Sequence, residues 1–423
     1  MKVIILNRFF APDQSATSRM AASLAFGLAA EGFEVEALAS DAWHDDATRR
    51  LPAMETVEGV RVFRVGGARF GRATLLGRAL DYATFHIAAA AKLAARARRG
   101  DVCVVCTDPP LMSVSAWPAI AAKRAVLVNW SNDLFPEAAF DAGVLPPTGL
   151  TGRVALALRN LTLRRARVTV APIERMAARL RAQGGSKARV AVVPHWSDGQ
   201  AIAPLPREAS RLREEWGLSG KFVVGYSGNL GRAHDFRTVL DAASRLRHRD
   251  DVAFLFVGGG HQRAWVEEEA RRRGLASVTF RPLQPLIRLS ESLASADVHL
   301  VTLLPEFELS VVPSKFYGIA AAGRPTLFVG DVDGEVAGLL RRHRCGASVP
   351  VGASEALAAH IERLADSPQL TARLGVAARR MFDERFSRRR GLAAWRTVIE
   401  SCAIRPASGA PSVFGADPAR TAR

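Results

Sequence analysis

The chain has 423 residues, of which 48% are hydrophobic and 23% are charged, so it is too long for one ordinary core and too apolar to be disordered. Four cysteines are too few for a disulfide scaffold, and Asn7 and Arg8 interrupt the opening apolar run, so we expect no signal peptide. No stretch reaches the roughly 18 apolar residues of a membrane span. Two domains in the cytoplasm are therefore predicted.

The net charge is +17, from 58 Lys and Arg residues against 41 Asp and Glu residues, and it attracts the molecule to polyanions. Nucleic acid, an anionic membrane surface and phosphate-bearing small molecules all fit such a charge. Aromatic residues make up only 7% of the chain, and we find no zinc-ligand pairs and no aromatic RNA-binding strand. These features argue against nucleic acid as the partner.

The first half of the chain alternates short apolar runs with stretches of helical composition. Residues 3–6 form an unbroken apolar run that suits a buried parallel strand, and a polar loop over residues 12–17 leads into a helix over residues 20–30. Further strands are predicted at residues 34–39, 102–106, 125–128, 167–170 and 190–193. Repeated strand–helix units of this kind predict a parallel, doubly wound sheet.

The same rhythm restarts after a proline-containing stretch at about residues 199–214, which has the composition of a linker. Strands of the second half are predicted at residues 222–226, 253–257, 278–280, 298–304 and 326–329. The last long helical segment is predicted from residue 369 to about residue 402. The chain is therefore predicted to be an α/β protein with two Rossmann-like halves in tandem.

The domain boundaries follow from these breaks in the pattern. They divide the chain into an N-terminal Rossmann-like domain (1–200), a linker (201–216), a C-terminal Rossmann-like domain (217–385), a helix packing back on the N-terminal domain (386–404) and a disordered tail (405–423). The tail is rich in Ala, Pro, Gly and Ser, and this composition does not support a packed core.

A glycine-containing turn follows the first strand of the second half. It holds Gly228, Asn229, Gly231 and Arg232, and backbone N–H groups in such a turn suit a diphosphate at the mouth of an open α/β sheet. The alternative is an ordinary tight turn between a strand and a helix. The three glycines at residues 258–260, after the next strand, allow the same interpretation or that of a flexible loop.

A second polar cluster lies between an apolar strand and a helix rich in small residues. Glu306 and Glu308 provide carboxylates that can accept sugar hydroxyls, while Ser314 and Lys315, with the first amides of the helix, can hold phosphate. The alternative makes both glutamates solvated loop charges and Ser314 a simple helix N-cap. The concentration of these groups in one segment favours a ligand site.

Four motifs together resemble a known family. They are YSGNLG at residues 226–231, PSKFYG at 313–318, AGRP at 322–325 and GDVDGE at 330–335. They look like the nucleotide-sugar half of family 4 glycosyltransferases, in particular the branch that builds bacterial surface polysaccharides, similar to colanic-acid and N-acetyl-L-fucosamine transferases. The resemblance runs from residue 10 to residue 386, and it implies the GT-B fold, in which two Rossmann-like domains face each other across a cleft.

The resemblance implies that Gly228, Asn229 and Arg232 border the donor diphosphate and that Glu335 lies near the sugar and phosphate. The whole predicted donor site consists of Gly228, Asn229, Gly231, Arg232, Glu306, Glu308, Ser314, Lys315 and Glu335. Many relatives carry a Glu-x7-Glu pair, whose two places are taken here by Ser310 and Gly318. Glu306 or Glu308 would therefore have to replace the first glutamate.

The resemblance assigns the first half of the chain to the acceptor. The residues predicted on the acceptor side are Gln14, Ser15, Thr17, Asn132 and His195. Asn132 stands where similar enzymes often carry a histidine, and Asp133 beside it is the polar residue expected at the reacting centre. Capping of the turn before Pro136 is the alternative role of Asp133.

The predicted catalytic residues are Asp133, Arg232 and Lys315. Arg232 and Lys315 would stabilise the departing diphosphate in place of a metal ion, since no Asp-x-Asp pair is placed to bind one. Cys103 and Cys106 lack a second pair that would complete a zinc site. We therefore expect no metal and no cofactor besides the nucleotide-sugar co-substrate.

Two basic amphipathic stretches in the first half predict contact with an anionic bilayer. The first combines Arg69, Arg72 and Arg78 with Phe70, Leu75, Leu76 and Leu80. The second combines Arg153, Arg159, Arg164 and Arg165 with Val154, Leu156, Leu158, Leu161 and Leu163. Ordinary surface helices are the alternative. The predicted location is the inner face of the bacterial plasma membrane, with peripheral attachment.

The sequence thus predicts a glycosyltransferase that moves a sugar from a nucleotide-diphosphate donor, first of all a UDP-sugar, to a polyprenyl-diphosphate-linked saccharide. An N-acetylated deoxyhexosamine is one option for the sugar. The product would be O-antigen, capsule or exopolysaccharide. The alternatives are an NAD-type oxidoreductase, a sugar epimerase and a nucleic-acid-binding protein. The first strand lacks the G-x-G-x-x-G of NAD enzymes, and nucleic-acid binding would explain the charge but not the turn motifs.

Overall fold

The structure is a computed structural model, and it describes residues 1–44, 46, 48–68, 70 and 75–403. The described residues form two compact units, one of residues 1–194 with residues 391–403 and the other of residues 195–390. The predicted tail at residues 405–423 lies outside the described residues. None of the helices in the described part of the chain combines the length and the apolar character that a membrane span needs.

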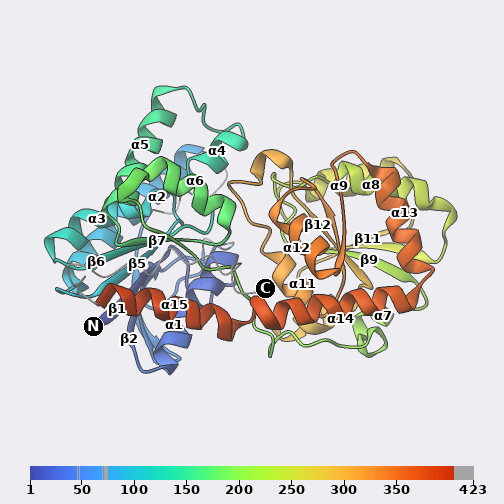
Figure 1. The fold of residues 1–423 in the computed structure, drawn as a ribbon, viewed down its shortest axis with the longest axis horizontal. Helices are drawn as coiled ribbons and strands as arrows, with labels where there is room; N and C mark the ends of the chain where they lie inside the picture. The colour runs from blue at the N-terminus through green and yellow to red at the C-terminus, as the bar shows by residue number, and fades with distance from the viewer. Residues whose placement is uncertain (45, 47, 69, 71–74, 404–423) are drawn as a thin grey trace, which may run out of the picture. The chain divides into compact units, whose positions relative to one another are not determined.

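The first unit is built on one sheet with the strand order β3-β4-β2-β1-β5-β6-β7-β8 (Figure 1). Its strands are β1 (Lys2–Leu6), β2 (Glu34–Ser40), β3 (Met54–Val57), β4 (Val60–Val65), β5 (Val102–Cys106), β6 (Val126–Trp130), β7 (Val168–Ala171) and β8 (Val190–Val192). Each neighbouring pair is parallel apart from β3 and β4, which form an antiparallel hairpin at one edge. Buried apolar runs such as VCVVC in β5 explain why the central strands form.

Helices cover both faces of this sheet, as a parallel sheet requires. They are α1 (Ala16–Ala30), α2 (Leu75–Arg96), α3 (Met112–Ala122), α4 (Glu137–Asp141), α5 (Leu150–Arg165), α6 (Glu174–Gly184) and α15 (Arg388–Ala403). Trp395 of α15 is fully buried and packs on Trp130 of β6, with ring centroids 4.7 Å apart. The C-terminal helix is therefore part of the core of the first unit.

The second unit has a parallel sheet with the order β11-β10-β9-β12-β13-β14. Its strands are β9 (Phe222–Ser227), β10 (Val252–Val257), β11 (Val278–Arg281), β12 (Val298–Thr302), β13 (Thr326–Val329) and β14 (Gly346–Val349). Its helices are α7 (Arg211–Glu215), α8 (Arg237–Arg245), α9 (Arg263–Arg272), α10 (Leu289–Ala294), α11 (Lys315–Ala321), α12 (Glu335–His343), α13 (Ser354–Ala365) and α14 (Pro368–Arg385).

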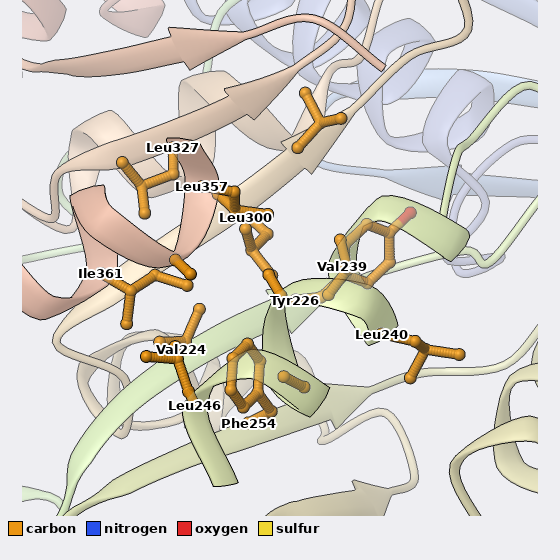
Figure 2. Close-up of a cluster of buried hydrophobic side chains, with 14 of the residues drawn as sticks. Val224, Tyr226, Val239, Leu240, Leu246, Phe254, Leu300, Leu327, Leu357 and Ile361 are labelled. Carbon is orange, nitrogen blue, oxygen red and sulfur yellow. The ribbon is translucent and has the colours of Figure 1, made fainter. Parts of the chain in front are cut away.

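The core on one face of this sheet joins the strands to α8 and α13. Figure 2 shows Val224, Phe254 and Leu300 from three strands grouped with Val239 of α8 and Ile361 of α13. The ring of Tyr226 belongs to the same cluster, and its hydroxyl oxygen lies at the edge of the group in Figure 2. The end of β9 is therefore held by packing, and the polar tip of Tyr226 remains available for hydrogen bonding.

The helical segment predicted from residue 369 to about residue 402 consists of two helices, because α14 ends at Arg385 and α15 begins at Arg388. The backbone of Ser197 accounts for the break. Its N–H donates to the Phe386 carbonyl at 3.1 Å, and its carbonyl accepts from the Arg388 N–H at 3.0 Å. Residues 386 and 387 leave the helix to make this short strand-like pairing.

Candidate donor-binding site

The glycine-containing turn after β9 is fixed by the neighbouring loop after β10. The N–H of Gly228 donates to the Val257 carbonyl at 2.8 Å, and the N–H of Leu230 donates to the Gly259 carbonyl at 2.7 Å. The side-chain amide of Gln262 donates to the carbonyls of Gly231 and His234, at 2.6 and 2.9 Å. These hydrogen bonds hold the backbone of the turn in one conformation.

The glycines at residues 258–260 are needed for this packing. Gly258 has a φ of +144°, and a Cβ built on it would lie 2.0 Å from the carbonyl oxygen of Gly228. A Cβ on Gly260, whose φ is +134°, would lie 2.2 Å from Oδ1 of Asn229. The two turns approach each other so closely that side chains cannot fit between them. Gly258 and Gly260 are therefore required for a steric reason, which favours a fixed turn over a flexible loop.

Lys315 lies beside this turn, although the two are far apart in the sequence. It is the first residue of α11, and its Nζ lies 3.9 Å from the centroid of the Tyr226 ring. The same Nζ donates a hydrogen bond to the Tyr226 hydroxyl, which donates to the Asn229 carbonyl at 2.8 Å. Burial lowers the pKa of Lys315 to about 7. The structure thus joins two predicted parts of the donor site.

His234 is a site residue that sequence reasoning missed. Its Nε2 lies 3.3 Å from Nζ of Lys315, and its Nδ1 is hydrogen-bonded to the Thr302 carbonyl. Burial, and secondly the charge of Lys315, lower the pKa of His234 to about 3. The one signal in the sequence was its place in the glycine-containing turn, three residues after Gly231.

The predicted carboxylates of the donor site lie in different environments. Glu308 is buried, and its Oε1 accepts a hydrogen bond from the N–H of Glu335 at 2.6 Å. One Glu308 oxygen therefore caps the start of α12. Glu335 is half-buried, whereas Glu306 is exposed. At the first place of the family's glutamate pair, Ser310 is fully buried and its hydroxyl donates to the Phe307 carbonyl at 3.5 Å.

Two other predicted donor residues are exposed, namely Ser314 before α11 and Arg232 in the turn. Ser314 stands at the N-cap position of α11, but its side chain makes no capping hydrogen bond. The position that the N-cap alternative gives to Ser314 is therefore confirmed, without a capping hydrogen bond from its side chain. Both side chains face solvent on the segments that carry Lys315 and Asn229.

The predicted acceptor residues of the first unit lie after β1 and β6, which flank β5 in the sheet. The Thr17 hydroxyl donates to the Asp108 carboxylate at 3.0 Å, and the N–H of Ser15 donates to the Asp13 carboxylate at 2.8 Å. Asp108, which follows β5, was missed from the sequence. Gln14 is exposed. The loops that follow the carboxyl ends of β1 and β5 thus meet at one edge of the sheet.

The predicted residues after β6 differ in exposure. Asn132 is buried, whereas Asp133 is exposed. His195 lies in the second unit, where it is buried and contacts the Tyr317 ring edge-on at 6.1 Å. Burial lowers the pKa of His195 to about 4, so its imidazole is neutral at physiological pH. The residues predicted on the acceptor side are therefore divided between the two units.

Comparison with known protein families decides between the alternative functions. A model described as a glycosyl transferase 4-like domain matches residues 15–196, and a model described as glycosyl transferases group 1 matches residues 221–367. The chain belongs to the family 4 glycosyltransferases. The predicted glycosyltransferase activity is confirmed, and the alternatives of an oxidoreductase, an epimerase and a nucleic-acid-binding protein are set aside.

Two relatives of this glycosyltransferase come from bacteria. A protein named as a glycosyltransferase, WbjE of Pseudomonas aeruginosa, is 28% identical over 281 residues, which are 65% of this chain and 68% of the relative. A protein named as a glycosyl transferase of colanic acid biosynthesis, WcaI of Escherichia coli K12, is 38% identical over 103 residues, which are 24% of this chain and 25% of the relative.

Solved structures show that this glycosyltransferase has the GT-B fold. Sucrose-phosphate synthase from Thermosynechococcus elongatus matches with a TM-score of 0.74 and 16% identity, over 95% of this chain and 99% of that one. HepE from Anabaena, solved with UDP and glucose, matches with a TM-score of 0.71 and 19% identity, over 95% of this chain and 100% of that one. The predicted fold class of two Rossmann-like domains is confirmed.

Proposed function

We propose that this glycosyltransferase moves a sugar from a UDP-sugar to a lipid-linked saccharide during synthesis of a bacterial surface polysaccharide. One observation carries the proposal for the donor. The ammonium of Lys315 is hydrogen-bonded to the Tyr226 hydroxyl, which is itself hydrogen-bonded to the backbone of the glycine-containing turn at Asn229. A cation beside a hydrogen-bonded, partly exposed turn at the carboxyl end of a parallel sheet suits a diphosphate. The solved relative HepE binds UDP and glucose, and WcaI is named for colanic acid synthesis.

The reaction breaks the bond between the sugar's anomeric carbon and the diphosphate oxygen, and negative charge grows on that oxygen. Lys315 and Arg232 are proposed to stabilise this charge, in the role that a metal ion plays in other transferases. Asp133, exposed after β6, is proposed to act on the acceptor side of the reaction. Lys315 and Arg232 are assigned to leaving-group stabilisation by their positive charge, and Asp133 is assigned to the acceptor side by its charge and exposure.

Thermal unfolding with a panel of UDP, GDP, dTDP and NAD tests the donor. We expect UDP to raise the midpoint of unfolding, because a ligand at 100 times its Kd stabilises the folded state by about 2.7 kcal/mol. GDP and dTDP should raise it less, and NAD should leave it unchanged. A rise with NAD alone would contradict the proposal, and a rise with GDP or dTDP alone would change the proposed base.

An exposed apolar stripe on α2 supports attachment to the membrane. Leu76, Leu80, Ala83 and Ile87 recur at the spacing of one helix face, and Leu76 and Ile87 are each 72% exposed. Helix α5 repeats the pattern with exposed Leu150, Val154 and Leu161. Such faces, on a chain of net charge +17, suit an anionic bilayer at whose surface a lipid-linked acceptor would lie.

The structure corrects one part of the predicted basic surface. Arg159 was expected on the exposed face of α5, but its side chain is buried and its guanidinium donates to the Glu137 carboxylate at 2.6 Å. Arg153, Arg164 and Arg165 of the same helix are exposed. Arg69 and Arg72 lie outside the described residues. The proposed membrane face therefore depends on apolar side chains more than the sequence indicated.

Replacing both Leu76 and Ile87 with glutamate is expected to lower binding to vesicles that contain anionic phospholipid by about tenfold, because it removes apolar insertion and adds repulsive charge. Co-sedimentation with the vesicles measures this. The control is Val376→Glu, which changes a 71% exposed apolar residue on α14 of the second unit. The control adds one negative charge and the double variant adds two, so an equal loss for each added charge would show that net charge, and not the stripe on α2, governs attachment.

A further inference from the structure

Five groups of the second unit form one chain of hydrogen bonds. It runs from the Thr302 carbonyl through the imidazole of His234 to Nζ of Lys315, and from there through the Tyr226 hydroxyl to the Asn229 carbonyl. A carbonyl oxygen can only accept, so Nδ1 of His234 must carry the proton. The Nε2 of the neutral ring then presents its lone pair to Lys315, 3.3 Å away. The contact with Thr302 thus selects the tautomer of His234.

The imidazole is held in place from several sides. Its ring contacts Tyr226 and Phe236 edge-on, with centroids 6.0 and 6.2 Å apart. The His234 carbonyl accepts from the Gln262 side chain at 2.9 Å, and Thr302 is fully buried at the end of β12. Because burial and the charge of Lys315 lower the pKa of His234 to about 3, the ring stays neutral at physiological pH. It therefore remains an acceptor for the ammonium.

We propose that His234 is a positioning residue that aims the ammonium of Lys315 at the donor diphosphate. The inference rests on the proposed function. A lysine ammonium has three N–H donors, and among the described residues Tyr226 and His234 accept two of them. These two bonds fix the direction of the third donor, which is then available to a phosphate oxygen. Without His234 the flexible lysine side chain would have one anchor fewer.

The test compares substitutions that keep or remove the acceptor. Glutamine offers an N–H to the Thr302 carbonyl and an oxygen to Lys315, so His234→Gln should keep kcat within about threefold. His234→Leu and His234→Ala remove both bonds and should lower kcat by about 30-fold, with a smaller change in the KM for the donor. Two apolar variants are used so that, if one of them fails to fold, the other still tests the inference.

A double substitution separates positioning from simple structural support. If His234 acts through Lys315, then His234→Leu should cause no further loss of kcat in a Lys315→Ala background. A residue that merely stabilises the fold would add its own loss in that background. Independent losses, or a His234→Gln variant as impaired as His234→Leu, would overturn the inference.

A measurement without substrate keeps the inference distinct from the proposed function. The pH dependence of Lys315 labelling by an amine-reactive reagent, followed by peptide mass spectrometry, reports the protonation of its ammonium. The titratable groups in contact with that ammonium in the described chain are Tyr226 from β9 and His234 from the following turn. The labelling midpoint should move to lower pH in His234→Leu and stay in His234→Gln. Identical midpoints would overturn the inference even if the donor were not a UDP-sugar.

Discussion

Replacing Lys315 with alanine is expected to lower kcat for sugar transfer by about 100-fold, while the affinity for free UDP falls by less than about tenfold. The physical reason is that negative charge grows on the diphosphate oxygen only as the bond to the sugar breaks. A cation at that position, which Tyr226 and His234 hold in place, therefore stabilises the transition state more than the bound nucleotide. Initial rates give kcat, and titration calorimetry gives the Kd of UDP.

Two controls show whether the loss of kcat is specific to the charge of Lys315. Lys123→Ala removes one exposed lysine of the first unit and should leave kcat unchanged. The pH dependence gives a second control, because burial lowers the pKa of Lys315 to about 7 and the anion prefers the protonated amine. Affinity for UDP should therefore fall as the pH rises through about 7, by less than about tenfold in total in the wild type, and this fall should be absent in Lys315→Ala. Equal losses of kcat and affinity would remove the leaving-group assignment.

The central strands could be predicted from the sequence because buried parallel strands are continuous apolar runs. Residues 102–106 and 326–329 were predicted with the bounds that the structure gives. The missed strands β3, β4 and β14 lack this signal in whole or in part. β3 has exposed and half-buried residues in alternation at the sheet edge, and β14 has the small residues GASV. Edge strands are shaped by their neighbours more than by their own composition.

The donor site shows the same division between local pattern and tertiary contact. The glycine-containing turn and Lys315 could each be identified from local motifs, but their contact follows from β9 and β12 being neighbours in the sheet. Neither motif by itself predicts that these two strands are neighbours. A lone histidine such as His234 has no periodicity, so its partners became visible only in the fold. Arg159 was misplaced because a basic pattern on a helix does not reveal a buried carboxylate such as Glu137.

Replacing Gly258 with alanine is expected to destabilise the protein by about 3 kcal/mol and to abolish its stabilisation by UDP. The added Cβ would lie 2.0 Å from the carbonyl oxygen of Gly228, and the φ of +144° is unfavourable for any residue with a side chain. The two turns must therefore separate. Because the turn at residues 228–231 is the proposed diphosphate site, binding of UDP should be weakened together with the stability of the fold. Thermal unfolding with and without UDP measures both effects.

The next residue provides a matched control for this substitution. A Cβ on Gly259 would have no heavy atom within 4 Å, so Gly259→Ala changes the same loop by the same methyl group without a clash. We expect its unfolding midpoint and its response to UDP to stay close to those of the wild type. If both variants lost the same stability and the same response, loop flexibility, and not the close approach of the two turns, would be what the glycines supply. A normal UDP response in Gly258→Ala would instead separate the diphosphate site from the turn that Gly258 supports.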